Sequence, residues 1–396
     1  MKRYQMCSCE VSALHANPAI FTKHRYRNQV PSRNIHAEPF DDETLVKLEI
    51  FSQYARAWVP TFAHKRYSIL MIDAFAGPGV DIQGRNGSPL LFLSAIREQR
   101  GRLLANRSSV KLVLNDITKS KVDELRSRIT PMVENEEDLR RLVQLSFSSM
   151  DAIALLKNVL DNPDDNPVLV CIDQNGIRAL SAEIIELLSR WSRLDLLMFC
   201  SSSYIGRFGD TPEFKGYIDY LDIESIRNQP SHMQHRELTR QIRSRFSDKH
   251  HLKFASFSIK KGGNTYGVIF GSHSYRGIEK FLDVAWNLNK TNGEANFDID
   301  GDLDKVRQPD LFGARRTKKQ LFEDDLLEKI RDRRLQTNLD VYPFTLESGF
   351  LPTHAKDALR DFKSNGNISF KGQPLVSWEK FRDNVSITYE VINGAK

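Results

Sequence analysis

One stretch, residues 67–96, constrains the fold of this chain more than any other. It begins with a short apolar run at residues 68–72, breaks at the glycine-rich loop D-A-F-A-G-P-G (residues 73–79), and resumes as an apolar helix. Ser88 can cap the free N–H groups at the start of that helix, and Pro89 fits its first turn. A strand, a glycine turn and a helix in this order are typical of the first unit of a nucleotide-binding α/β sheet.

The spacing of the glycine loop distinguishes between ligands. A dinucleotide-binding loop would run from G-x-G-x-x-G directly into its helix, whereas here residues 80–87 separate Gly79 from the predicted helix cap. An acidic residue ahead of the glycines, as in D-x-F-x-G-x-G, resembles motif I of S-adenosylmethionine-dependent methyltransferases. We therefore predict that Asp73, Phe75, Gly77 and Gly79 hold the methionine end of S-adenosylmethionine. The alternative is an ordinary strand-to-helix turn.

The composition is that of an ordinary globular protein. With 396 residues, of which 40% are hydrophobic, the chain is long enough for two domains. Its apolar runs are too short to span a membrane, and its start lacks the apolar segment of a secretory signal. The four cysteines are too few for a disulfide framework, which favours a cytoplasmic location. The net charge of +6 permits a nucleic-acid partner without requiring one.

The first 40 residues show no periodicity and are predicted to form an N-terminal arm. Cys7, Cys9 and His15 match no standard zinc pattern, so no metal is predicted, although whether they bind one stays open. From residue 41 onward the pattern becomes helical. Its apolar positions recur at steps of three and four: Leu45, Leu48, Phe51, Tyr54 and Trp58.

Two acidic residues follow the next two predicted strands. Asp116 ends the apolar run at residues 110–116, where an acid accepts hydrogen bonds from ribose hydroxyls in nucleotide-binding sheets. Asp151 follows the strand at residues 142–147 and would meet the amino group of adenine. Each is also a good helix N-cap, so both interpretations remain open.

The fourth predicted strand, residues 167–172, ends in Asp173, Gln174 and Asn175. The carboxyl end of a central strand is where open α/β sheets place their chemistry. We predict that these three side chains face the methyl group and orient or deprotonate the acceptor. The motif is neither the D/N-P-P-Y/F clamp of amino-methylating enzymes nor the Pro-Cys nucleophile of cytosine C5 enzymes.

A hairpin completes the first domain. Residues 253–260 and 266–271 flank the turn K-G-G-N, which is a hairpin signal. Five strand–helix units closed by a hairpin predict an α/β fold over residues 41–290, with the seven-stranded, Rossmann-like sheet of class I methyltransferases and one antiparallel strand.

Residues 291–320 are predicted to be a linker, and residues 321–396 a winged-helix-like α+β module of three short helices and a wing. Such modules bind nucleic acid, or they act as docking or lid modules. Two basic helix faces are candidates for phosphate contacts, with a solvated surface as the alternative. Their residues are Arg236, Arg240 and Arg243 on one helix and Lys356, Arg360 and Lys363 on the other.

Five short motifs spread over residues 42–390 occur together in this chain. They are K-L-E-I-F-x-x-Y-x-x-A-W (47–58), D-A-F-A-G-P-G (73–79), G-S-P-L (87–90), I-D-Q-N-G (172–176) and F-T-L-E-S-G-F-L-P-T-H-A-K (344–356). In combination they resemble the three-Cys-motif partner protein (TcmP) family. The resemblance implies a methyltransferase-like fold, S-adenosylmethionine as cofactor, and a neighbouring three-cysteine protein that resembles radical S-adenosylmethionine enzymes. Where many relatives have D-P-F/Y-G, this chain has D-Q-N-G, which puts direct transfer of their chemistry in doubt.

These observations predict an S-adenosylmethionine-dependent enzyme. It would act on nucleic acid or on a nucleotide-derived group in a modification or phage-defence pathway, without a membrane partner. One alternative is a non-catalytic scaffold or nucleic-acid-binding partner of the three-cysteine protein. Another is a transcriptional regulator on a degenerate fold, which would bind duplex DNA with a strong salt dependence.

Overall fold

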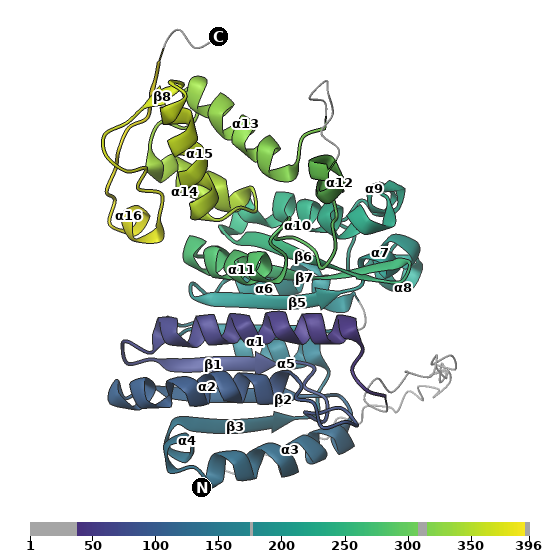
Figure 1. Ribbon diagram of the computed structural model, residues 1–396. Helices are drawn as coiled ribbons and strands as arrows, with labels where there is room; N and C mark the ends of the chain where they lie inside the picture. Colours follow the sequence, from purple (N-terminus) through teal and green to yellow (C-terminus); the bar gives the residue numbers. More distant parts are fainter. Residues whose placement is uncertain (1–37, 175–176, 308–314, 393–396) are drawn as a thin grey trace, which may run out of the picture. The chain divides into compact units, whose positions relative to one another are not determined.

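Figure 1 shows a computed structural model of the chain, which describes residues 38–174, 177–307 and 315–392. The predictions for Cys7, Cys9, His15 and Asn175 lie outside these residues, as does almost all of the predicted N-terminal arm. No helix in the described ranges is long and apolar enough to cross a membrane.

The core of the fold is a seven-stranded sheet in the order β3-β2-β1-β4-β5-β7-β6. All neighbouring strands from β3 to β5 are parallel, and β7 alone runs antiparallel to both of its neighbours. This confirms the predicted class I methyltransferase-like sheet. The antiparallel strand lies one place inside the edge, because the hairpin folds back so that β6 is outermost. The strands are β1 (Ser68–Asp73), β2 (Ser109–Asn115), β3 (Val143–Ser148), β4 (Val168–Asp173), β5 (Leu194–Cys200), β6 (Lys253–Lys261) and β7 (Asn264–Ser272).

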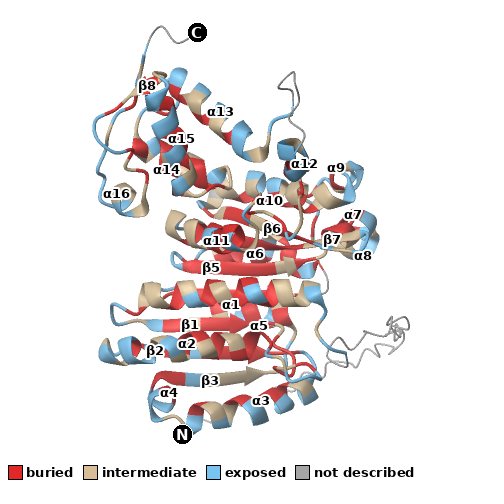
Figure 2. Ribbon diagram, in the orientation of Figure 1, coloured by how far each residue is buried: buried red, intermediate tan, exposed pale blue. Residues whose placement is uncertain are grey.

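Helices cover both faces of the sheet, so its central strands are buried on both sides (Figure 2). One face packs against α1 (Asp42–Phe62), α2 (Ser88–Ala105), α3 (Lys119–Glu134), α4 (Glu137–Leu142) and α11 (Tyr275–Leu288). The other packs against α5 (Ala152–Leu160), α6 (Ala182–Ser189), α7 (Ser202–Phe208), α9 (Ile223–Asn228) and α10 (Gln234–His250). Shorter elements are α8 (Pro212–Lys215), η2 (Arg178–Leu180) and η3 (Ser231–Met233).

The C-terminal module has the three helices and the small two-stranded wing predicted for a winged helix, and a short fourth helix in addition. Within it, β8 and β9 pair antiparallel through Ile368 and Val391. The indole N–H of Trp286 on α11 donates to the carbonyl of Gly349 at 3.0 Å, in the turn between the second and third helices. The elements are α13 (Lys318–Arg331), α14 (Asn338–Glu347), α15 (Pro352–Ser364), β8 (Ile368–Ser369), α16 (Trp378–Arg382) and β9 (Glu390–Val391).

The stretch predicted to be a linker contains ordered structure in its described part. Glu294 and Asn296 exchange backbone hydrogen bonds with Ser258 of β6, at 2.7 and 3.1 Å. Asn292 and Ala295 are buried, and α12 (Asp302–Arg307) follows. These residues extend the methyltransferase-like unit toward α13.

Candidate functional site

The glycine loop after β1 lies at the carboxyl edge of the sheet and is held by its neighbours. The backbone N–H of Ala74 donates to the carbonyl of Cys171 on β4 at 3.0 Å, and that of Ala76 to the carbonyl of Asn115 on β2 at 2.7 Å. Gly77 and Gly79 have φ angles of 59° and 88°, a conformation that side chains disfavour. The loop geometry therefore requires glycine at both positions.

Gly79 has a packing role in addition. A Cβ at this position would lie 2.6 Å from a methyl carbon of Leu125 on α3 and 2.8 Å from one of Leu90 on α2. Close packing of the loop on two helices thus explains this glycine without a ligand. For Gly77 the positive φ angle accounts for glycine, and approach of a ligand to its backbone stays a prediction.

Asp73 is a fully buried carboxyl group with an unsatisfied oxygen. Its Oδ1 accepts from the backbone N–H of Phe75 at 3.2 Å, whereas Oδ2 has no hydrogen-bond partner in the described part of the chain. Burial raises the pKa of Asp73 to about 7; the nearby Ser88 hydroxyl opposes this rise, and the carboxylate of Asp173 adds to it. An unpaired buried acid is costly, and it is the group that a ligand's ammonium would satisfy.

Asn115 is a site residue whose role the sequence did not show. Its side-chain amide donates to the carbonyls of Ala74 and Met150, both at 3.1 Å, and its Oδ1 accepts from the N–H of Met150 at 3.0 Å. This residue therefore ties the ends of β1, β2 and β3 together. The neighbouring Asp116 accepts from the N–H of Thr118 at 2.8 Å through Oδ1, and its Oδ2 makes no hydrogen bond to the described residues.

Asp151 has both carboxylate oxygens engaged. Its Oδ1 caps α5 by accepting from the N–H groups of Ile153 and Ala154, at 3.0 and 3.2 Å. Its Oδ2 pairs with Arg178 at 3.1 Å. The helix-cap interpretation therefore describes the contacts of Oδ1, and a role of Asp151 toward adenine remains a prediction.

The carboxyl end of β4 carries an ion pair that sequence reasoning missed. Nζ of Lys47 on α1 donates to Oδ2 of Asp173 at 2.5 Å and lies 4.7 Å from the centroid of the Phe199 ring. Gln174, which is 4% exposed, accepts the N–H of Ala179 through Oε1 at 3.0 Å. Its Nε2 is buried and has no partner among the described residues.

The sequence does contain a signal for Lys47. Positions 47, 51, 54 and 58 lie on one face of a helix, and in α1 all four are buried. The other three are Phe51, Tyr54 and Trp58, so a lysine interrupts an apolar stripe. A charged residue on a buried stripe indicates a specific partner.

The eight residues after Gly79 form a compact, hydrogen-bonded turn between the glycine loop and α2. Val80 pairs with Asn86 across it. Asp81 accepts from the backbone N–H groups of Gln83 and Arg85, each at 2.9 Å, and from that of Phe40 at the same distance. Burial would raise the pKa of Asp81, but these bonds and the Arg85 guanidinium lower it to about 2.

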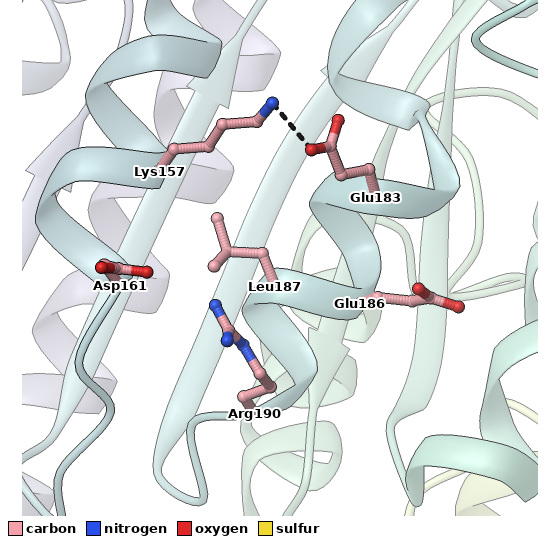
Figure 3. Close-up of a pocket in the computed structure, with 6 residues that line it drawn as sticks. All are labelled: Lys157, Asp161, Glu183, Glu186, Leu187 and Arg190. Carbon is pink, nitrogen blue, oxygen red and sulfur yellow. Dashed lines mark ion pairs between the residues drawn. The ribbon is translucent and has the colours of Figure 1, made fainter.

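Two hollows on the described part of the surface lie away from the glycine loop. One, of about 410 Å³, lies between α5 and α6, where Lys157 pairs with Glu183 at 2.7 Å (Figure 3). The other lies against α10 and contains Arg240 and Gln241. Neither is lined by a residue of the glycine loop or of the strand ends.

The basic face predicted on α10 mostly points into the protein. Arg236 pairs with Glu294 at 2.7 Å and Asp300 at 2.9 Å. Arg243 donates to the carbonyls of Phe254 and Glu347 at 2.8 and 3.1 Å. Arg240 alone among the three is well exposed, and it pairs with a glutamate one turn earlier.

The basic residues of α15 are more accessible. Arg360 and Lys363 are exposed, and Lys356 is half-buried. Arg360 pairs with Asp357 at 3.0 Å, and Lys363 donates to the carbonyl of Phe370 at 2.7 Å. Nucleic-acid binding through either helix remains a prediction.

The strand order and the acid-led glycine loop together define a class I methyltransferase-like domain, followed by a winged helix. Residues 298–374 match the family described as GMT-like wHTH domain. No curated protein matches the chain.

Several solved structures are similar to this chain. The O-methyltransferase TomG of Streptomyces achromogenes, in complex with SAM, is 13% identical over 59% of this chain and 90% of its own, with a TM-score of 0.33. A Bacillus cereus O-methyltransferase in complex with SAH is 11% identical over 59% and 92%, with a TM-score of 0.29. A Legionella pneumophila protein is 12% identical over 65% and 93%, with a TM-score of 0.37. These identities and TM-scores are too low to carry an argument. The assignment to the class I methyltransferase-like fold therefore depends on the strand order and the glycine loop of this chain.

Proposed function

We propose that this protein is an S-adenosylmethionine-dependent methyltransferase that acts on nucleic acid or a nucleotide-derived group, in a modification or phage-defence pathway. The observation that carries the proposal is the unpaired Oδ2 of the buried Asp73, at the start of the glycine loop. Such an atom is costly unless a ligand pairs with it. The ammonium of a methionine moiety carries the opposite charge and could donate a hydrogen bond to this oxygen.

The residues around the loop fit the rest of this ligand. Gly77 would allow close approach to the backbone, and the free oxygen of Asp116 would accept from a ribose hydroxyl. Beside it, Ile117 and Met150 are 72% and 40% exposed, on the two loops that Asn115 ties together. Exposed apolar side chains at this position would gain from covering the flat face of an adenine ring.

Methyl transfer depends mainly on the alignment of the acceptor atom with the methyl group. S-adenosylmethionine supplies an activated methyl group when it is bound, and transfer then depends on holding the acceptor in line with it. Asp173, at the carboxyl end of β4, is the group placed to orient the acceptor or take its proton. Lys47 holds that carboxylate in one position.

We extend the proposal to partners on the basis of the five motifs. The protein would be a member of the TcmP family. It would act together with a three-cysteine protein encoded nearby. The winged helix would contact nucleic acid. The GMT-like match over residues 298–374 supports the presence of the module but names no partner.

A second candidate function is a non-catalytic scaffold that uses the same domains to bind nucleic acid or the three-cysteine protein. The specific observation in its favour is the Lys47–Asp173 pair, which engages the predicted acceptor-facing carboxylate. A scaffold would bind its partners without transferring a methyl group.

Calorimetric titration with S-adenosylmethionine and S-adenosylhomocysteine tests the proposal. We expect micromolar binding by the wild type and its loss in Gly77→Val and Asp116→Ala, because a branched side chain at positive φ distorts the loop and the second change removes a ribose acceptor. Asp161→Ala, in the hollow between α5 and α6, is the matched control and should bind normally.

Two results would contradict the proposal. Absence of binding by the wild type, with or without nucleic acid, rules out the enzyme as described. Binding without methyl transfer to DNA, RNA or nucleotides, even with the three-cysteine protein added, would leave the scaffold function.

A further inference from the structure

A row of side chains continues the candidate site beyond the glycine loop along the carboxyl edge of the sheet. Asp73, Asp173, Phe199 and Tyr266 belong to β1, β4, β5 and β7, which are neighbours in that order. Side chains two positions apart on a strand share a face. The residues two positions away lie in the core that packs against α1: Met71, Cys171, Leu197 and Val268. The row therefore faces α1, which brings Lys47 to it.

Lys47 has hydrogen-bonding capacity that the protein does not use. An ammonium has three N–H donors, and Asp173 accepts from one of them at 2.5 Å. No second acceptor for Nζ is present among the residues that the structure describes. Since the side chain is only 10% exposed, water has little access to the remaining donors. A ligand oxygen would satisfy one of them.

Phe199 and Tyr266 form a stacked aromatic pair beside this ammonium. Their rings are parallel to within 1°, with centroids 5.9 Å apart, and both side chains are half-buried. They are diagonal neighbours, because Phe199 is paired with Val268 across β5 and β7. Packing against half-buried aromatic side chains is a usual way to hold an unpaired nucleobase.

We propose that Lys47, Asp173, Phe199 and Tyr266 form the acceptor subsite and that it takes a nucleobase with a carbonyl oxygen. The inference rests on the proposed function, whose substrate class it narrows. The base lies against the aromatic pair, and its carbonyl accepts from Lys47. Guanine, cytosine and uracil have such an exocyclic oxygen, whereas adenine offers only ring nitrogens as acceptors and has an amino donor at the matching edge position, so a donor placed for a carbonyl disfavours adenine.

Nucleosides test the subsite apart from any phosphate binding by the winged helix. Guanosine, cytidine, uridine and adenosine are added singly to the full-length protein saturated with S-adenosylhomocysteine, and binding is followed by saturation-transfer NMR. We expect the first three to bind and adenosine to bind at least about tenfold more weakly, because its amino group would face the Lys47 donor where the other bases present a carbonyl.

Variants locate the binding. Lys47→Met should weaken the three carbonyl-bearing nucleosides at least about tenfold, and Tyr266→Leu should weaken them as well. Lys157→Met also removes a lysine from an ion pair, with Glu183 on the far side of the sheet, and should change nothing. If Lys47→Met does not fold, the double variant Lys47→Met/Asp173→Asn removes both charges and takes its place.

The two proposals fail in different ways. Absence of S-adenosylhomocysteine binding contradicts the proposed function, and the nucleosides are then titrated into the protein alone. Retained cofactor binding with no nucleoside binding overturns the subsite only. Equal binding of adenosine, or binding unchanged in Lys47→Met and Tyr266→Leu, overturns it too.

Discussion

Asp73 begins the glycine loop and Asp81 lies in the turn that follows it, and the two carboxyl groups have opposite electrostatic environments. Asp81 accepts several hydrogen bonds, and its pKa is lowered to about 2. Asp73 is fully buried with one oxygen unpaired, and its pKa is raised to about 7, chiefly by burial. The Asp81 carboxylate therefore stabilises the folded protein near neutral pH, whereas the Asp73 carboxylate destabilises the ligand-free protein. Strained or unpaired groups of this kind concentrate at functional sites.

We predict that Asp73→Asn stabilises the ligand-free protein and abolishes cofactor binding. The folded state holds the Asp73 proton more tightly than the unfolded state, so this group lowers stability as pH rises from about 4 to about 7. At pH 8 the neutral amide should raise the free energy of unfolding, by about 4 kcal/mol at most, with little change at pH 4. Urea unfolding at the two pH values measures this.

Asp81→Asn is a control for which we expect the opposite change in stability. Its pKa is lowered, so the carboxylate contributes stability above about pH 4 that is lost as pH falls toward 2. The amide should therefore destabilise the protein at pH 8. A destabilised Asp73→Asn with unchanged cofactor affinity would show that Asp73 is a structural group.

At the scale of elements, β7 and α10 approach so closely that only glycine fits between them. His235 on α10 is fully buried, and its ring contacts Ser202 on α7 at 2.7 Å and the carbonyl of Val268 at 3.3 Å. A Cβ on Gly267 would lie 2.2 Å from Nε2 of this ring. Burial lowers the pKa of His235 to about 4, so the neutral ring is part of the packed interface.

We predict that Gly267→Ala destabilises the protein by about 2 kcal/mol, because overpacking displaces the imidazole. Thermal unfolding measures the change. Gly263→Ala, in open space on the same hairpin, should be close to neutral. In the Gly267→Ala background, His235→Ala should recover part of the loss, and a purely additive double variant would argue against the clash.

Local patterns predicted most elements, whereas contacts between distant residues were missed. The strand, loop and helix at residues 67–96 follow from apolar runs, glycines and a cap, and they occur as predicted. The placement of β7 inside the edge depends on pairing with β5, which no local pattern encodes. The ties of Asn115 and the partner of Lys47 are likewise set by residues 35 and 126 positions away.

At the scale of the whole molecule, the basic residues divide into two groups. Arg236 belongs to a network with Glu294, Asp300 and Lys318 that joins α10 to the start of α13. Burial would raise the pKa of Glu294, but Lys318 and Arg236 lower it to about 2. The bases of α15 have more exposed side chains and weaker local pairing. The Arg236 charge on α10 thus stabilises the fold, whereas Arg360 and Lys363 of α15 are exposed.

We predict that nucleic-acid affinity depends on α15 and scarcely on Arg236. If the winged helix contacts phosphates, the triple variant Lys356→Ala/Arg360→Ala/Lys363→Ala should reduce the slope of log affinity against log salt by about 2 to 3, through lost counterion release. Arg236→Ala should instead lower the free energy of unfolding by about 2 kcal/mol, since it leaves Glu294 and Asp300 without this partner. Fluorescence anisotropy with a labelled oligonucleotide, measured at several salt concentrations beside thermal unfolding, separates the two effects. A salt slope unchanged in the triple variant would contradict contact of α15 with phosphates. The alternative of a docking module would then be favoured, with the Arg360–Asp357 pair within α15 as part of its exposed surface.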